Sequence, residues 1–257
     1  MTIQLDLAQR VVVVTGGTRG VGRGIASRFL DAGAEVVVCG RSEPDQMVAT
    51  AGREAIFVAA DVREPDSVDD LVATVLARFG RLDVVVNNAG GSPPADAASA
   101  SPRFARAIIG LNLEAPLLVA QRANAAMQAQ DGGGCVINIA SVSGLRPSPG
   151  TAAYGAAKAG LINLTRSLAV EWAPAVRVNA VVAGLVRTEQ TNLHYGDDAA
   201  IAAVSATIPL GRLAEPAAIG DACVFLASPL AAYISGAALE VHGGGEPPPF
   251  LTAADPT

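Results

Sequence analysis

Short runs of β-branched residues alternate with longer stretches of helical periodicity along most of this chain. Most of the runs show no alternation of apolar and polar residues, which is typical of strands buried on both faces of a parallel sheet. Strand–helix alternation at this spacing indicates right-handed βαβ crossovers. The sequence therefore predicts an α/β fold: a Rossmann-type doubly wound parallel sheet of about seven strands, with helices on both faces, in a single domain.

The same pattern gives bounds for each element. The expected strands cover residues 11–15, 35–39, 55–59, 84–87, 136–140, 177–182 and 238–241. The expected helices cover residues 20–32, 65–79, 102–130, 152–173 and 216–227. The segment that begins at Gly243 is too rich in proline and glycine for regular structure, so we expect one domain over 1–245 and a Pro-rich tail over 246–257.

Composition narrows the class of protein. Of the 257 residues, 51% are hydrophobic and 16% are charged, which suits a large packed core. No apolar run approaches the roughly 18 residues of a membrane span, and the first residues lack the pattern of a secretory signal. The net charge of −6 disfavours nucleic acid and anionic membranes as partners. We therefore expect a cytoplasmic protein that binds neither.

The cysteines and histidines give no sign of a metal site. Cys39, Cys135 and Cys223 are far apart and lack Cys-x-x-Cys spacing, which favours buried reduced thiols. His194 and His242 form neither a metal cluster nor part of a Ser/His/Asp triad. We expect no bound metal.

A glycine-rich segment follows the first predicted strand directly. Thr15 to Gly22 has the spacing Gly-x-x-x-Gly-x-Gly, and a helix is expected from Gly20. Glycines let backbone N–H groups approach a phosphate that would clash with a Cβ atom, and the helix points its positive end at that anion. A glycine-rich turn alone is often only a tight loop, but after the first strand of a βαβ unit it favours a phosphate cradle.

Tyr154 and Lys158 lie four residues apart in a predicted helix and therefore project from one face, thirteen residues after Ser141. An ammonium beside a phenol favours the phenolate. Lowering the tyrosine pKa to neutrality needs about 4 kcal/mol, which a helical neighbour alone does not supply. With a further cation nearby, Tyr154 could exchange a proton with an alcohol or carbonyl oxygen.

Together these motifs resemble the short-chain dehydrogenase/reductase family in its single-domain form, over nearly the whole chain. The resemblance implies that residues 1–245 form a dinucleotide-binding oxidoreductase domain with a catalytic tetrad of Asn112, Ser141, Tyr154 and Lys158. Tyr154 would handle the proton, and Lys158 would lower its pKa and bind the ribose hydroxyls. Ser141 would donate a hydrogen bond to the substrate oxygen. Asn112 would hold a water that links Lys158 to solvent. In isolation, Ser141 and Asn112 would more simply cap or kink local elements.

The resemblance also assigns residues to the cofactor. The glycine turn would bind the pyrophosphate, Asp61 and Val62 the adenine, and the segment after the sixth strand the nicotinamide. The implied cofactor-binding residues are Gly16, Thr18, Arg19, Gly20, Val21, Gly22, Arg41, Asp61, Val62, Asn88, Ala89, Gly90, Tyr154, Lys158, Gly184, Val186 and Thr188.

The end of the second strand bears on the choice of dinucleotide. An acidic residue there would bind the ribose 2′-hydroxyl of NAD and repel a 2′-phosphate. The chain has Gly40 and then Arg41, and Arg19 lies in the glycine turn. Guanidinium groups pair with phosphates, so we expect NADP rather than NAD. The alternative is that Arg41 stacks on the adenine while Arg19 is solvated, with NAD as the cofactor.

Substrate choice should depend on residues 187–211, a long segment typical of a lid, in which His194 and Tyr195 are candidate contacts. We expect a small-molecule secondary alcohol or ketone. A 3-oxoacyl thioester reductase is the second hypothesis, weakened because the stretches 127–130 and 168–171 lack arginines for an acidic carrier protein. The third is a non-catalytic dinucleotide-binding sensor or scaffold, which would not need an intact tetrad.

The two long helices expected over 102–130 and 152–173 are rich in alanine and nearly free of lysine. Family members of this size usually assemble through these helices, so we expect a homodimer or homotetramer. A monomer in light scattering would contradict this prediction.

Overall fold

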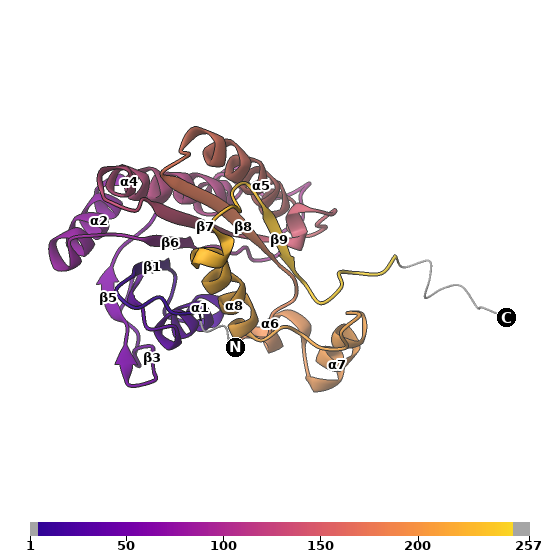
Figure 1. The fold of residues 1–257 in the computed structure, drawn as a ribbon. Coiled ribbons are helices and arrows are strands. Elements are labelled where there is room, and N and C mark those ends of the chain that lie inside the picture. The colour runs from indigo at the N-terminus through magenta and orange to yellow at the C-terminus, as the bar shows by residue number, and fades with distance from the viewer. Residues whose placement is uncertain (1–4, 249–257) are drawn as a thin grey trace.

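Seven parallel strands form the centre of the structure. They are β1 (Val11–Thr15), β2 (Glu35–Gly40), β5 (Ile56–Ala59), β6 (Val84–Asn87), β7 (Gly134–Ser141), β8 (Val176–Ala183) and β9 (Ala238–Val241). Their order in the sheet is β5-β2-β1-β6-β7-β8-β9 (Figure 1). This computed structural model describes residues 5–248. The predicted α/β fold, with a doubly wound sheet of seven strands, is confirmed.

Helices cover both faces of this sheet because its central strands are apolar on both sides. The helices are α1 (Gly20–Asp31), α2 (Pro65–Phe79), α3 (Pro102–Ile109), α4 (Ala115–Ala129), α5 (Ala152–Glu171) and α8 (Pro216–Ala227). In β1, Val12 and Val14 pack in one cluster with α1 and α8, whereas Val11 and Val13 pack in another with α2 and α4. Figure 1 shows α2, α4 and α5 on one side of the sheet and α1 and α8 on the other.

The order in which the chain adds strands to the sheet reverses between β1 and β6. β2 and β5 lie on one side of β1, while β6 to β9 lie on the other. Val12 of β1 is in register with Val36 on one side and with Val84 on the other. In a doubly wound sheet, the loops after two such neighbouring strands diverge and leave a crevice at their carboxyl ends. This crevice positions the candidate site.

The helix predicted over 102–130 is interrupted by a π-helical turn. α3 and α4 are joined by Gly110–Glu114, where the Ala115 N–H donates to the carbonyl of Gly110, five residues back. Pro116 gives the physical reason: it has no N–H to donate to the carbonyl of Asn112, the bond that an α-helix would make. Helical periodicity in the sequence does not reveal a π-helical turn, because such a turn widens the helix without ending it.

The other differences from the predicted elements are smaller. α1 ends at Asp31 and α5 at Glu171, slightly before the expected ends, and β7 and β8 are longer than expected. Residues 187–211, for which the sequence predicts no helix, contain two. The additional elements are α6 (Thr191–Tyr195), α7 (Asp198–Ala206), the short turns Val142–Gly144 and Pro229–Ala231, and a hairpin of β3 (Ala49–Thr50) and β4 (Arg53–Glu54).

The start of the Pro-rich tail contacts the domain. Glu246 pairs with Arg146 of the loop after β7, with 2.5 Å between Glu246 Oε2 and Arg146 Nε. Residues 249–257 of the predicted tail lie outside the described residues, so the division at 245/246 stays a prediction. No helix within residues 5–248 is long and apolar enough to cross a membrane.

Candidate active site

A cavity of about 730 Å³ lies at the carboxyl ends of the central strands. Its walls are the loops after β1, β2, β5 and β6, the ends of β7 and β8, the start of α5, and the segment that leads into α6. The fold thus brings together most of the predicted site residues. Those that line the cavity are Gly16, Thr18, Arg19, Gly20, Val21, Arg41, Asp61, Val62, Asn88, Ala89, Gly90, Ser141, Tyr154, Lys158, Gly184, Val186 and Thr188. Gly22 and Asn112 lie behind this lining.

Close contacts require glycine in the turn after β1. A Cβ atom on Gly22 would lie 2.2 Å from the carbonyl oxygen of Gly16, and Gly16 itself has a φ of +62°. The Asn88 amide fastens the turn by donating to the carbonyls of Thr15 at 2.9 Å and Gly16 at 3.2 Å. Gly22 therefore contributes by letting α1 pack closely under the turn, not by lining the cavity. The arrangement directs the N-terminus of α1 into the cavity and fits the pyrophosphate of a dinucleotide.

Tyr154 and Lys158 lie one turn apart at the start of α5. The Lys158 Nζ lies 5.6 Å from the centroid of the Tyr154 ring and donates a 2.7 Å hydrogen bond to the carbonyl of Ile139 in β7. Lys158 is only 3% exposed, and burial lowers its pKa to about 8. The predicted pair on one helix face is therefore present, with the amine anchored to a strand carbonyl.

Ser141 is the partner of Tyr154 at the end of β7. Burial raises the pKa of Tyr154 above its ordinary value, and the hydrogen bond with Ser141 acts in the opposite direction. The Ser141 Oγ also accepts a 3.2 Å hydrogen bond from the Ser143 N–H, which fixes its position. The groups of the chain thus keep Tyr154 protonated at neutral pH, in line with the expectation that a helical lysine alone does not produce the phenolate.

Asn112 lies in the π-helical turn and is fully buried. Its side-chain amide donates to the carbonyls of Gly91 at 3.0 Å and Ile108 at 2.9 Å, and its Oδ1 accepts from the Gly91 N–H at 2.9 Å. A Cβ on Gly90 would lie 2.6 Å from Asn112 Oδ1 and 3.4 Å from Lys158 Nζ, so the three residues are close-packed. Because the side chain is engaged, the group of Asn112 suited to the predicted water is its backbone carbonyl, whose α-helical donor Pro116 cannot supply.

Arginines lie around the end of the cavity where β2 and β5 stop. β2 ends at Gly40, and Arg41 follows it in the cavity lining. Arg63 clamps Asp61 through Nε at 2.9 Å and Nη2 at 2.5 Å. This hydrogen bonding from Arg63 holds the pKa of Asp61 at about 2, with a smaller contribution from the charge of Arg41. The carboxylate of Asp61 is therefore ionised and fixed in orientation.

Among the lining residues that were not predicted site residues, three have long polar or charged side chains: Arg63, Glu189 and Gln190. Arg63 directly follows the Asp61-Val62 pair, and Glu189 and Gln190 are the two residues after Thr188. Their position next to a motif was the one sign in the sequence that these three residues could belong to the site. Of the two candidate lid contacts, His194 lines the cavity, whereas Tyr195 packs against the apolar cluster around Ile201.

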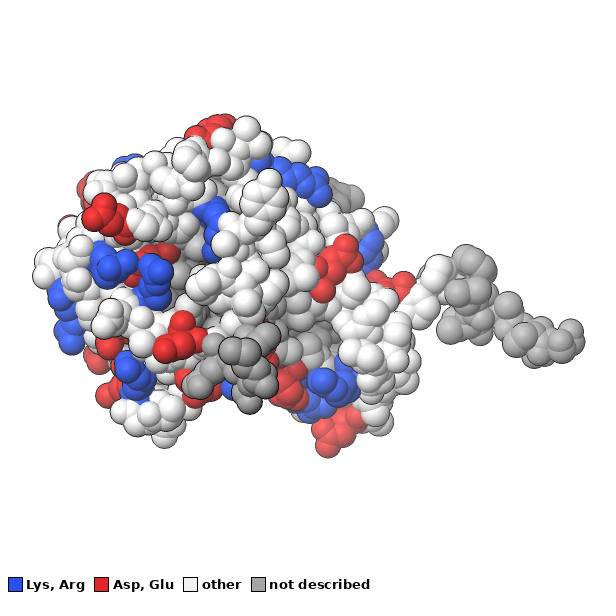
Figure 2. Space-filling view, in the orientation of Figure 1, with Lys and Arg blue, Asp and Glu red and all other residues white. Residues whose placement is uncertain are grey.

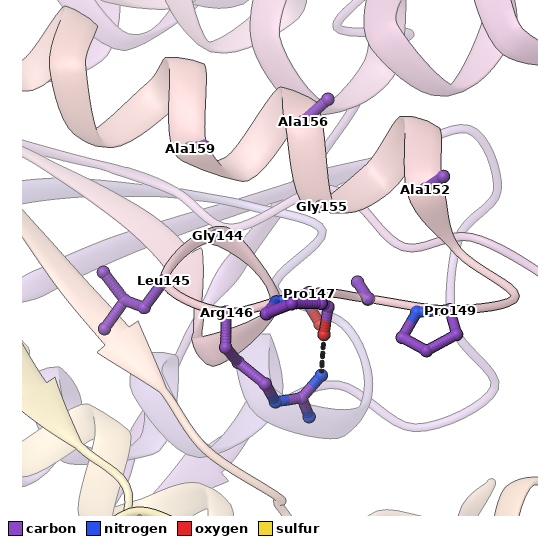
Figure 3. Close-up of a pocket in the computed structure, with 11 residues that line it drawn as sticks. Gly144, Leu145, Arg146, Pro147, Pro149, Ala152, Gly155, Ala156 and Ala159 are labelled. Carbon is purple, nitrogen blue, oxygen red and sulfur yellow. Dashed lines mark hydrogen bonds between the residues drawn. The ribbon is translucent and has the colours of Figure 1, made fainter.

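A second cavity, of about 630 Å³, lies between one face of α5 and the loop after β7 (Figure 3). Its helical wall is made of Ala152, Gly155, Ala156 and Ala159. Figure 3 shows Arg146 turned away from α5, with a 2.8 Å hydrogen bond to the carbonyl of Pro147. Neither Tyr154 nor Lys158 lines this cavity, so it is separate from the candidate active site.

Charge and metal-ligating groups are dispersed. Among the described residues on the face shown in Figure 2, acidic and basic side chains are interspersed rather than gathered by sign. Within residues 5–248, no group of three or more His, Cys, Asp or Glu side chains could hold a metal ion. The three cysteines are buried, and burial raises the pKa of Cys39 to about 12 and that of Cys135 to about 11.

Fold and site together define a class of protein. A doubly wound sheet with a glycine cradle at its switch point binds dinucleotides. A half-buried tyrosine with a serine and a lysine near it can exchange a proton with a substrate oxygen. These two features, facing one cavity, define a dinucleotide-dependent oxidoreductase.

The chain belongs to the short-chain dehydrogenase/reductase family. A family model described as enoyl-(acyl carrier protein) reductase matches residues 16–246. A cis-4-hydroxycyclohexanecarboxylate dehydrogenase of Sinomonas cyclohexanicum is 39% identical, over 92% of this chain and 96% of its own length. A 3-oxoacyl-[acyl-carrier-protein] reductase of Synechocystis sp. is 37% identical, over 93% of this chain and 97% of its own length.

Solved structures agree with this assignment. The ligand-free aldohexose dehydrogenase of Thermoplasma acidophilum has a TM-score of 0.85 to this chain at 30% identity, covering 98% of this chain and 97% of that one. The predicted family is thereby confirmed. The protein is an oxidoreductase that acts on CH–OH groups and uses a nicotinamide dinucleotide.

Lys158 is the only lysine in the sequence, which makes its titration directly observable. In protein labelled with ¹³C-lysine, we expect the Cε resonance to titrate with a midpoint at about pH 8, because burial disfavours the ammonium. The same resonance in urea-unfolded protein should titrate near 10.4. A midpoint in the folded protein that matches the unfolded one would contradict the buried environment described for Lys158.

Proposed function

We propose that the protein transfers a hydride between NADP(H) and a secondary alcohol or ketone, with Tyr154 as the acid–base group. The observation that carries the proposal is the placement of Tyr154. Tyr154 is half-buried at the wall of the cavity, Ser141 lines the same cavity and acts on its hydroxyl, and the Lys158 Nζ lies 5.6 Å from the centroid of its ring. A proton donor and a second hydroxyl thus converge where a substrate oxygen can lie.

In the direction of reduction, Tyr154 gives its hydroxyl proton to the oxygen of the ketone and becomes a phenolate. Ser141 donates a hydrogen bond to the same oxygen and stabilises negative charge that develops on it. In the direction of oxidation, the phenolate takes the alcohol proton back. Because the native pKa of Tyr154 lies above its ordinary value, the protonated form that reduction needs is the resting form at neutral pH.

Lys158 stabilises the phenolate that remains after proton transfer. The hydrogen bond to the Ile139 carbonyl holds Nζ beside the tyrosine ring, and a cation there favours the charged phenol oxygen. A lysine with a pKa of about 8 is close enough to neutrality to take part in returning the proton. The carbonyl of Asn112, which receives no α-helical bond from Pro116, is the group we propose for the water that connects Lys158 to solvent.

The residues of the cavity fit the dinucleotide from end to end. The glycine turn and the N-terminus of α1 would hold the pyrophosphate, Asp61 and Val62 the adenine, and Lys158 the ribose next to the nicotinamide. Gly184, Val186 and Thr188 would hold the nicotinamide. When bound, the nicotinamide supplies or accepts the hydride.

We propose NADP(H) rather than NAD(H) because of the charges beside Asp61. No carboxylate follows β2 directly, and Arg41 lies in the lining at that position. Arg19 and Arg63 line the same cavity, and Arg63 offsets the charge of Asp61 through its ion pair. A 2′-phosphate would therefore meet guanidinium groups rather than a carboxylate.

The chemistry of the lining favours a small hydroxylated substrate. Gln190 and His194 line the same cavity as Ser141 and Tyr154 and offer polar groups to a substrate. Relatives named for a hydroxycyclohexanecarboxylate and for an aldohexose support the same class. A 3-oxoacyl thioester is the second candidate, supported by the carrier-protein reductases among the relatives. The stretches 127–130 and 168–171 contain no arginine to bind an acidic carrier, which favours the first candidate.

For the cofactor, we expect Arg41→Asp to weaken NADPH binding by about 10- to 100-fold and NADH binding by much less, because only NADPH has a 2′-phosphate to lose a charged hydrogen bond. Fluorescence titration of each dinucleotide measures this. Arg53→Asp is the matched control, since Arg53 pairs with Glu35 outside the cavity. Equal losses of NADPH and NADH affinity would contradict the assignment to NADP.

For the reaction, we expect Tyr154→Phe to reduce kcat by about 10²- to 10⁴-fold, because the proton donor is removed while the ring remains. NADPH oxidation is measured on ketones, diketones and acyl thioesters, alongside the Kd for NADPH, which should stay within about two-fold. Tyr233→Phe is the control, because Tyr233 is fully exposed and does not line the cavity.

Each outcome separates the hypotheses. Turnover of ketones that depends on Tyr154 supports the proposed function, and turnover of acyl thioesters alone supports the second candidate. Tight NADPH binding without turnover on the whole panel would favour a non-catalytic sensor and reject the proposal.

A further inference from the structure

The first N–H group of α1 is bonded to a carboxylate from a distant part of the chain. The Gly20 N–H donates a 2.9 Å hydrogen bond to Oε1 of Glu189, which is 169 residues further along the sequence. Both residues line the candidate active-site cavity. Glu189 thus places a negative charge at the helix end to which we assign the cofactor's pyrophosphate.

The helix itself offers no cap or charge of its own at this end. Arg19, the N-cap residue, makes no side-chain capping bond, and the first turn of α1 contains no acidic residue. The N–H groups of a helix N-terminus carry a partial positive charge that attracts anions. Glu189 therefore takes the place that a capping side chain or a bound anion would fill.

Glu189 is held in position by the segment between β8 and α6. The Thr188 N–H donates a 2.7 Å hydrogen bond to Oγ1 of Thr191 at the start of α6. The methyl group of Thr188 would lie 3.6 Å from a Cβ on Gly20, so the segment packs against the glycine turn. Gln190 and His194 of the same segment line the cavity. The bond from Glu189 thus ties the substrate side of the cavity to the cofactor side.

We propose that the Glu189 carboxylate competes with the pyrophosphate of the dinucleotide for the N-terminus of α1, and that cofactor binding displaces it. This inference rests on the proposed function, which assigns the pyrophosphate to that helix end. A carboxylate and a pyrophosphate are both anions, so they repel each other at one positive site. By linkage, the bond to Gly20 lowers cofactor affinity, and the bound cofactor weakens that bond by the same factor.

Removing the charge of Glu189 while keeping its shape tests this competition. We expect Glu189→Gln to bind NADPH about two- to five-fold more tightly than the wild type by calorimetric titration, the size of a single charge at a helix N-terminus. The difference should shrink at high salt, because screening weakens the repulsion. Adenosine 2′-monophosphate has no pyrophosphate, and its affinity should be the same in both proteins.

The control variant is Glu215→Gln. Glu215, just before α8, carries the same charge, is exposed, and lies 3.9 Å from Arg187 without lining the cavity. NADPH affinity should not change in this variant. A second readout needs no cofactor: Glu189→Ala should lower the melting temperature of the cofactor-free protein, because the first N–H of α1 loses its acceptor.

Equal or weaker NADPH binding by Glu189→Gln, with normal binding by the wild type, overturns the competition and leaves the proposed function intact. A gain of the same size in Glu215→Gln also overturns it, since the effect would then be one of net charge. If the wild type does not bind NADPH at all, the proposed function fails and the competition fails with it.

Discussion

The rest of the structure depends on the hydrogen bonds that hold β1 between β2 and β6. All three of these strands run in the same direction. Because the strands are parallel, their carboxyl ends lie at one edge of the sheet, and every loop that leaves this edge can contribute to one site. The turn after β1 and the loop after β6 meet there, and the amide of Asn88 joins them. Neither segment would form a phosphate cradle alone. The turn is held by hydrogen bonds from Asn88, and Asn88 is in place only because β6 pairs in register with β1.

A series of hydrogen bonds between buried polar side chains fixes the position of the catalytic helix α5 against the sheet. Asn87 of β6 donates to the carbonyl of Pro116 and to Oδ1 of Asn138 in β7, and Asn138 donates to Thr165 of α5. Each bond lies in the interior, where an unpaired amide would cost about 1–3 kcal/mol, so the helices have one favourable position against the strands. Lys158 adds the bond from α5 to the Ile139 carbonyl. Tyr154, one turn earlier on the same helix, is thereby placed beside Ser141 at the end of β7.

The sequence was sufficient for the elements that repeat a pattern and insufficient for those that depend on contacts between distant segments. The seven strands of the sheet and the glycine turn follow from apolar runs and from glycine spacing, which are local properties. The tetrad and the cofactor residues came from the family resemblance, and the fold brings nearly all of them to one cavity. Arg63 and Glu189 were missed because their importance lies in partners, Asp61 and Gly20, that spacing does not reveal. The environment of Tyr154 also needed the structure, because the balance of burial and hydrogen bonding that sets its pKa is not visible in a motif.

The π-helical turn between α3 and α4 holds one residue more than an α-helical turn would. Losing one residue from Gly110–Glu114 would change its pairing from five residues to the four of an α-helix, so α3 and α4 could keep their places while the residues within the turn moved around the helix axis. Asn112 would still be encoded, yet its side chain would no longer face both Gly91 and Ile108. Among homologues, a one-residue gap in this stretch would therefore mark a rebuilt site more reliably than many substitutions inside the cavity. An alignment that slides such a gap to the nearest loop would hide that change.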